Sequence, residues 1–174
     1  LESLTFLGKE LYIDNNSSLL NLSGLNNIDT IFDRVDIYQN SSLQSLTGLG
    51  SIKHIEANLS ISNNYELVSL SALENLNTIG GDLLILSNSS LNTLSGLDNL
   101  ISVGGYITIF NNYDLANCNG INSLNSIGSS LDIRNNDSLI NLSGFNNLSS
   151  IGGYFAVSEN DGLVDFSGIE SLTT

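Results

Sequence analysis

The side chains in this sequence that could do chemistry are mostly carboxylates. Glu10, Asp14 and Asp36 fall close to Arg34 in the pattern, on what the sequence predicts as the outward face of two adjacent strands. Clustered carboxylates can hold calcium, and a pair within roughly 5–10 Å can hydrolyse a glycoside. The 18 acidic residues make such neighbours frequent by chance. We therefore expect no enzymatic activity, and the sequence leaves open whether this cluster binds calcium.

The other reactive residues are one histidine and one cysteine. His54 occupies a column that other repeats fill mostly with Thr and Ser, so we expect a solvated side chain and not a member of a catalytic triad. Cys118 stands where other repeats have Leu or Phe, which predicts a small core residue with a raised pKa. No Cys-x-x-Cys, His-x-x-x-His, P-loop or dinucleotide fingerprint occurs. The sequence predicts no metal site and no cofactor.

A strict internal repeat determines how all these residues are placed. Asparagines recur every 24 residues without an insertion: Asn16, Asn40, Asn64, Asn88, Asn112, Asn136 and Asn160. With this asparagine numbered as position 24, position three is always Leu, and positions six, nine, twelve and fifteen are apolar. Positions 19 and 21 alternate in the manner of a strand, as in Leu83 and Ile85. The sequence therefore predicts a mainly β solenoid of 24-residue turns.

The repeat also predicts the domain organisation and the role of the asparagines. We expect a single solenoid over residues 1–174, with a partial turn at 1–16, six full turns at 17–160 and a partial turn at 161–174. Equivalent amides of stacked turns would lie about 4.8 Å apart, where each can hydrogen-bond to the next. This asparagine ladder would be buried.

The segments from Leu94 to Asn112 and from Leu142 to Asn160 share the pattern Leu-x-Gly, three spaced apolar residues, Gly-Gly, and an alternating strand that ends at Asn. This pattern resembles the receptor L domains, a leucine-rich repeat group. The resemblance covers the whole chain and implies a right-handed single-stranded parallel β-helix with a secreted or cell-surface binding or adhesive role. The regular repeat is most similar to the bacterial surface members. Receptor domains carry disulfides and irregular loops that this sequence lacks, so no functional residue is carried over.

Charge limits the choice of partner. The net charge of −14 disfavours nucleic acid and anionic membrane surfaces, and no apolar run is long enough for membrane insertion. A protein or carbohydrate ligand is expected, on the outward positions 18, 20 and 22 of the main sheet. Apolar and aromatic residues at these positions form the candidate ligand surface: Leu84, Leu86, Tyr106, Thr108, Phe110, Tyr154, Tyr12 and Tyr38.

Two other functions and one assembly are left open by the sequence. A polysaccharide-processing β-helix enzyme would use stacked carboxylates such as Glu74 and Asp98. Ice binding would use the small polar residues at positions five and seven, such as Ser45 and Thr47. A homo-oligomer could form through uncapped ends or through the exposed aromatic residues.

Overall fold

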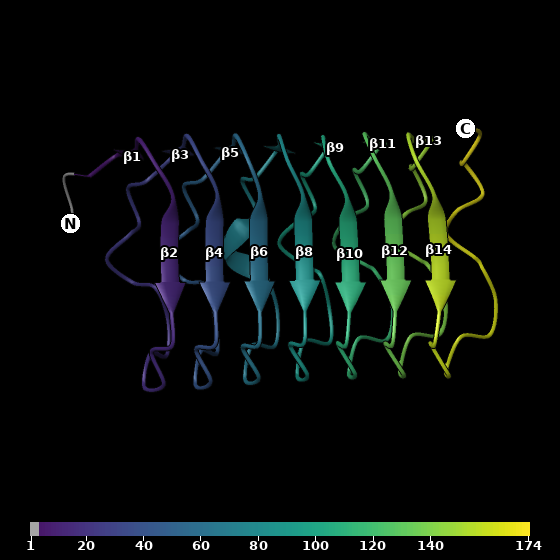
Figure 1. Ribbon diagram of the computed structural model, residues 1–174, viewed down its shortest axis with the longest axis horizontal. Coiled ribbons are helices and arrows are strands. Elements are labelled where there is room, and N and C mark those ends of the chain that lie inside the picture. The colour runs from purple at the N-terminus through teal and green to yellow at the C-terminus, as the bar shows by residue number, and fades with distance from the viewer. Residues whose placement is uncertain (1–3) are drawn as a thin grey trace.

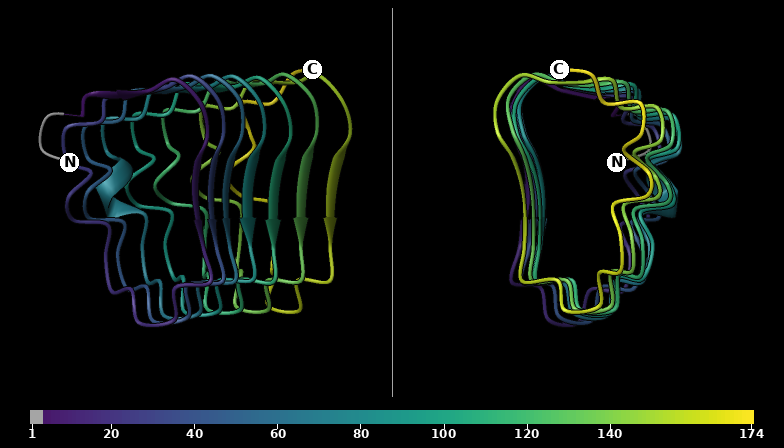
Figure 2. Two further views of the ribbon diagram at one scale, coloured as in Figure 1. Left: turned by 60° about the vertical axis from the view of Figure 1, so that its left-hand side comes forward. Right: turned by 90° about the vertical axis from the view of Figure 1, so that its right-hand side faces the viewer.

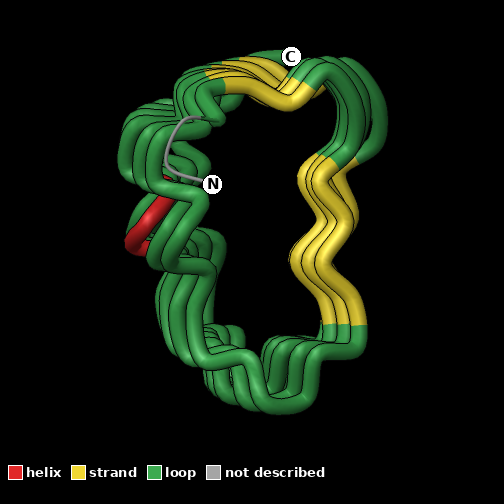
Figure 3. Tube along the Cα trace, turned by 90° about the vertical axis from the view of Figure 1, so that its left-hand side faces the viewer, coloured by secondary structure: helices red, strands yellow, loops and turns green. Residues whose placement is uncertain are grey.

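The computed structural model describes residues 4–174 as a solenoid of stacked turns (Figure 1). Viewed from the C-terminal end, the chain descends through the strands on one side, returns on the other, and advances toward the viewer (Figure 2). The coil is therefore right-handed. Seen from the N-terminal end, the turns superpose, with the longer strands along one side, short strands at one corner, and loops with one short helix on the opposite side (Figure 3). The predicted mainly β solenoid with a repeat of 24 residues is confirmed.

Within residues 4–174, two parallel sheets run along the coil, and each contains seven strands. The main sheet consists of β2 (Leu11–Asp14), β4 (Val35–Tyr38), β6 (Leu59–Ser62), β8 (Leu83–Leu86), β10 (Ile107–Phe110), β12 (Leu131–Arg134) and β14 (Phe155–Ser158). The second sheet consists of β1 (Phe6–Leu7), β3 (Thr30–Ile31), β5 (His54–Ile55), β7 (Thr78–Ile79), β9 (Ser102–Val103), β11 (Ser126–Ile127) and β13 (Ser150–Ile151). Equivalent positions pair without slippage, as Leu83, Ile107 and Leu131 do.

One turn differs from the others at position eight. Glycines there adopt positive φ, for example Gly48 at 121° and Gly96 at 114°. The intervening turn has Ala72 at this position, and a Cβ disfavours such a φ. The chain instead forms a short 3-10 helix, η1 (Ser71–Leu73).

The predicted inward columns form one continuous apolar core from Leu22 to Ile151. At position three, Leu43, Leu67 and Leu91 have no exposed surface. Because every turn contributes the same columns, each turn is covered by its two neighbours and the core extends as a rod. This regular packing fixes the outward positions in equally regular rows.

The asparagine ladder is present, and it is buried from Asn40 onward. The Nδ2 of Asn88 donates to Oδ1 of Asn112 at 3.4 Å, and Oδ1 of Asn112 also accepts the backbone N–H of Asn88 at 3.1 Å. Nδ2 of Asn112 donates to the carbonyl of Ile85 at 2.9 Å. The same set of bonds recurs along the corner, so each side chain satisfies backbone groups of two successive turns.

Candidate ligand-binding site

The outward face of the main sheet brings five of the predicted surface residues together. Thr108 and Phe110 on β10 pair laterally with Leu84 and Leu86 on β8. Tyr106 immediately precedes β10 and has 47% of its surface exposed. We call these five residues, Leu84, Leu86, Tyr106, Thr108 and Phe110, the central patch. Neighbouring strands lie about 4.8 Å apart, so the central patch is contiguous.

Hydrogen bonds and a cation border the central patch. The carboxylate of Asp82 accepts the backbone N–H of Tyr106 at 2.8 Å, which fixes the start of β10. On the other side, the Arg134 guanidinium lies 6.0 Å from the centroid of the Phe110 ring and makes an ion pair of 2.7 Å with Asp132. The central patch is therefore apolar in its middle and charged at its border.

The three remaining predicted residues lie apart from the central patch. Tyr12 on β2 and Tyr38 on β4 are separated from it by β6, whose outward residues include Ser60 and Ser62. Tyr154 stands two turns from Tyr106, with the buried Ser130 between them. These three tyrosines occupy outward positions of the same kind, but they do not lie within the central patch.

The acidic cluster near the N-terminal turns is organised around an arginine. Nε of Arg34 lies 3.0 Å from Glu10 and 3.1 Å from Asp36. Partial burial raises the pKa of Asp36 although Arg34 opposes this shift, and the charge of Asp36 in turn raises the pKa of Arg34. The guanidinium thus pairs with two of the carboxylates of the predicted cluster, Glu10 and Asp36. Across residues 4–174, no group of three or more His, Cys, Asp or Glu residues is arranged to hold a metal ion.

The two other reactive residues lie where the sequence places them. His54 is exposed, and its Nδ1 lies 2.8 Å from Oγ1 of Thr78 on the next turn. Cys118 is completely buried in the core, and desolvation raises the pKa of its thiol to about 12. A thiol in this state is neutral at physiological pH and is not a nucleophile.

Most small hydroxyl residues at positions five and seven pair within their own turn. Ser45 donates to Thr47 at 3.0 Å, and the Oγ atoms of Ser69 and Ser71 lie 3.2 Å apart. These pairs close the turn ahead of position eight.

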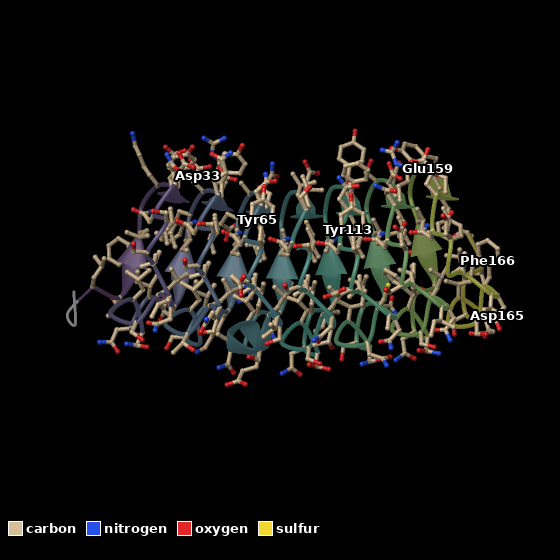
Figure 4. The ribbon with its side chains drawn as sticks, turned by 90° about the horizontal axis from the view of Figure 1, so that it is seen from below. Asp33, Tyr65, Tyr113, Glu159, Asp165 and Phe166 are labelled. Carbon is tan, nitrogen blue, oxygen red and sulfur yellow. The ribbon has the colours of Figure 1, made fainter. Side chains whose placement is uncertain are left out.

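A hollow that the sequence analysis did not identify lies at the corner after the main sheet. It has a volume of about 300 Å³. Three successive corners line it, each with its residues at position 23 and position 1: Asn63, Tyr65, Ser87, Ser89, Asn111 and Tyr113. Figure 4 looks at this corner from below and shows Tyr65 and Tyr113 on turns separated by one intervening turn. The signal in the sequence is the tripeptide Asn-Asn-Tyr, repeated at residues 63–65 and 111–113 with Ser-Asn-Ser between them.

Comparison with known families agrees with this geometry. The family model of the receptor L domain matches residues 29–96. The matched segment covers less than half of the chain and is similar to the receptor L domain family. No curated protein and no solved structure matched the chain.

The segment that matches the receptor L domain includes part of the central patch and part of the corner hollow. It runs from the turn of β3 through β8, and so contains Leu84, Leu86 and Tyr65 but not Tyr106 or Tyr113. Receptor L domains are extracellular ligand-binding modules, and the family is not enzymatic. Among the described residues, no helix has the length and apolar character needed to cross a membrane.

Proposed function

We propose that this receptor L-domain solenoid is a secreted or cell-surface adhesion module that binds a protein ligand at the central patch. The observation that carries the proposal is the contiguity of Leu84, Leu86, Tyr106 and Phe110 on a sheet face that is otherwise mainly polar. Apolar and aromatic side chains gathered in this way mark contact surfaces more often than chance. The regular repeat supports an origin among the bacterial surface members of the group.

The shape of the central patch favours a protein over a small ligand. Four-residue strands lie side by side and present their side chains in one shallow layer, without walls. A flat surface of this kind gains affinity from aromatic anchors near its centre. Tyr106, with half of its surface exposed, and the half-buried Phe110 are suited to that role.

Charge indicates the character of the partner. The chain carries a net charge of −14, with Asp82 and Asp132 beside the central patch. A partner with a basic border around an apolar centre would be attracted over long range and would complement this face. We therefore expect association to slow as the salt concentration rises.

The experiment uses an array of purified extracellular proteins that includes this chain itself, with neutral and acidic glycans on the same surface. The test variant combines Tyr106→Thr with Phe110→Thr, because threonine keeps the β-branched preference of a strand. The matched control combines Tyr12→Thr with Tyr154→Thr, which removes two exposed tyrosines outside the central patch.

Wild-type chain and the control are expected to bind the same protein spots, with at least tenfold weaker binding by the test variant. The site assignment is wrong if the test variant keeps wild-type affinity for those spots. Binding only to glycan spots would overturn the proposal of a protein ligand. Binding only to the spots of the chain itself would make the central patch a self-association surface.

A further inference from the structure

The corner after the main sheet carries a second arrangement with the geometry of a binding site. Two tyrosines at position one, Tyr65 and Tyr113, flank Ser89 on the intervening turn. At position 23, Asn63 and Asn111 flank Ser87 in the same way. The hollow therefore exists because the middle turn has two small side chains between larger ones.

The backbone holds this arrangement rigidly. The ladder residues Asn64, Asn88 and Asn112 lie between the two outward columns and are fully buried. The preceding residues Asn63, Ser87 and Asn111 all have left-handed φ angles of 57–59°. Each tyrosine follows directly after a ladder asparagine, so its Cα position is fixed by hydrogen bonds to the neighbouring turns.

The spacing of the tyrosines defines what fits between them. Two turns separate their backbones by about 9.6 Å, so a ring over Ser89 would lie about 4.8 Å from each tyrosine. Both tyrosines are accessible, with 48% and 42% of their surfaces exposed. The face of an aromatic ring is electron-rich and attracts the C–H groups of a saturated ring. A pyranose ring presents such groups on both faces.

The remaining lining groups are polar and uncharged. The Oδ1 atoms of Asn63 and Asn111 already accept one bond each, from the hydroxyl group of Tyr65 at 3.5 Å and from Nδ2 of Asn135. Their Nδ2 groups can still donate, and Ser87 and Ser89 supply hydroxyl groups that donate and accept. Sugar hydroxyl groups do both as well, so they can pair with these groups. The net charge of −14 repels sugars that carry carboxylate or sulfate.

We propose that the hollow between Tyr65 and Tyr113 binds one neutral pyranose unit of a glycan. This site goes beyond the proposed protein-binding function, since it lies at the corner after the strands and shares no residue with the central patch. Other turns do not reproduce it, because position one is Ser17, Ser41, Asp137 or Asp161 there.

The test measures binding of the chain to neutral oligosaccharides built from glucose, galactose, mannose and their N-acetylated amino sugars. Sialylated and uronic-acid oligosaccharides and an aromatic tetrapeptide serve as comparison probes. Three variants are compared with wild type: Tyr65→Ala, Tyr113→Ala and Ser89→Tyr. The last keeps both tyrosines but fills the space between them. Tyr12→Ala, which removes an even more exposed tyrosine elsewhere, is the control, and circular dichroism verifies folding.

The expected result is binding of at least one neutral oligosaccharide by wild type and the Tyr12→Ala control. Tyr65→Ala and Tyr113→Ala should each weaken it at least tenfold, and Ser89→Tyr should abolish it. The proposal is overturned if no neutral oligosaccharide binds, if acidic sugars or the tetrapeptide bind better, or if folded Ser89→Tyr binds like wild type. Should Ser89→Tyr fail to fold, Ser89→Gln provides the same blockage.

Discussion

The asparagine column and the central patch both consist of residues that recur every 24 positions, yet they behave in opposite ways. Asn40, Asn64, Asn88, Asn112 and Asn136 are identical and have no exposed surface. Across the strands that carry the central patch, equivalent positions hold residues as different as Ser60, Leu84, Thr108 and Asp132. Burial enforces repetition, whereas the solvent-facing rows are free to vary. Binding function is therefore to be sought where the repeat is broken on the outside.

The largest expected effect comes from the apolar interior. Leu91→Ala should lower the free energy of unfolding by about 2–5 kcal/mol, because it leaves a cavity among side chains of three turns. Ile140→Ala, at a position with 51% exposure, should change it by less than about 0.5 kcal/mol. Urea unfolding measures both. Equal effects from the two variants would contradict the division between inward and outward columns.

The ladder should be nearly as sensitive. Asn112→Ala removes the acceptor of the Asn88 N–H and the donor to the Ile85 carbonyl, which leaves buried polar groups unpaired. Each such group costs about 1–3 kcal/mol, so we expect a loss of about 2–4 kcal/mol in urea unfolding. Ser89→Ala, on the same corner but lining the hollow, is the control and should be close to neutral. A mild Asn112→Ala phenotype would show that the ladder does not stabilise the fold.

A smaller, pH-dependent effect should come from Cys118. Its pKa rises from 9.0 to about 12 in the folded protein, so the buried neutral thiol contributes stability that is complete below pH 9 and is lost as pH rises toward 12. At pH 10 the loss from this group should be about 1.4 kcal/mol. Cys118→Leu restores the residue of the other turns and should lose less stability between pH 8 and pH 10. Identical pH profiles for the two proteins would contradict thiol burial.

The smallest effect on stability is expected at the central patch. The Tyr106→Thr and Phe110→Thr double variant removes outward rings and keeps the strand, so the midpoint of thermal unfolding should shift by only a few degrees, corresponding to less than about 1 kcal/mol. If the double variant lost as much free energy of unfolding as Leu91→Ala, the rings of Tyr106 and Phe110 would be needed for folding and not for binding.

The fold could be predicted from the sequence because burial imposes a periodic choice of residue. Leu at position three and Asn at position 24 fixed the columns, and an insertion-free repeat fixed the register. The 3-10 helix η1 was harder to predict, because it depends on how the backbone accommodates Ala72 at a position where the other turns have a glycine with positive φ.

The surface was only partly predictable for a related reason. Position type placed Leu84, Leu86 and Phe110 on the outward face, and these residues occupy adjacent turns. The same reasoning also collected Tyr12, Tyr38 and Tyr154, although lateral distance grows with every turn between residues. The corner hollow was missed because its defining feature is missing bulk at Ser87 and Ser89, which is visible only when the tripeptides Asn-Asn-Tyr and Ser-Asn-Ser of successive turns are compared.

Nearest-neighbour stacking also has a mechanical consequence. A tensile load applied along the rod axis would be carried in series by every interface between adjacent turns, and because no strand spans more than its own coil, these interfaces could separate one after another. Each turn that detaches would release 24 residues, or roughly 80 Å of extended chain. Such a molecule would lengthen in uniform steps under tension while its remaining coils stayed folded.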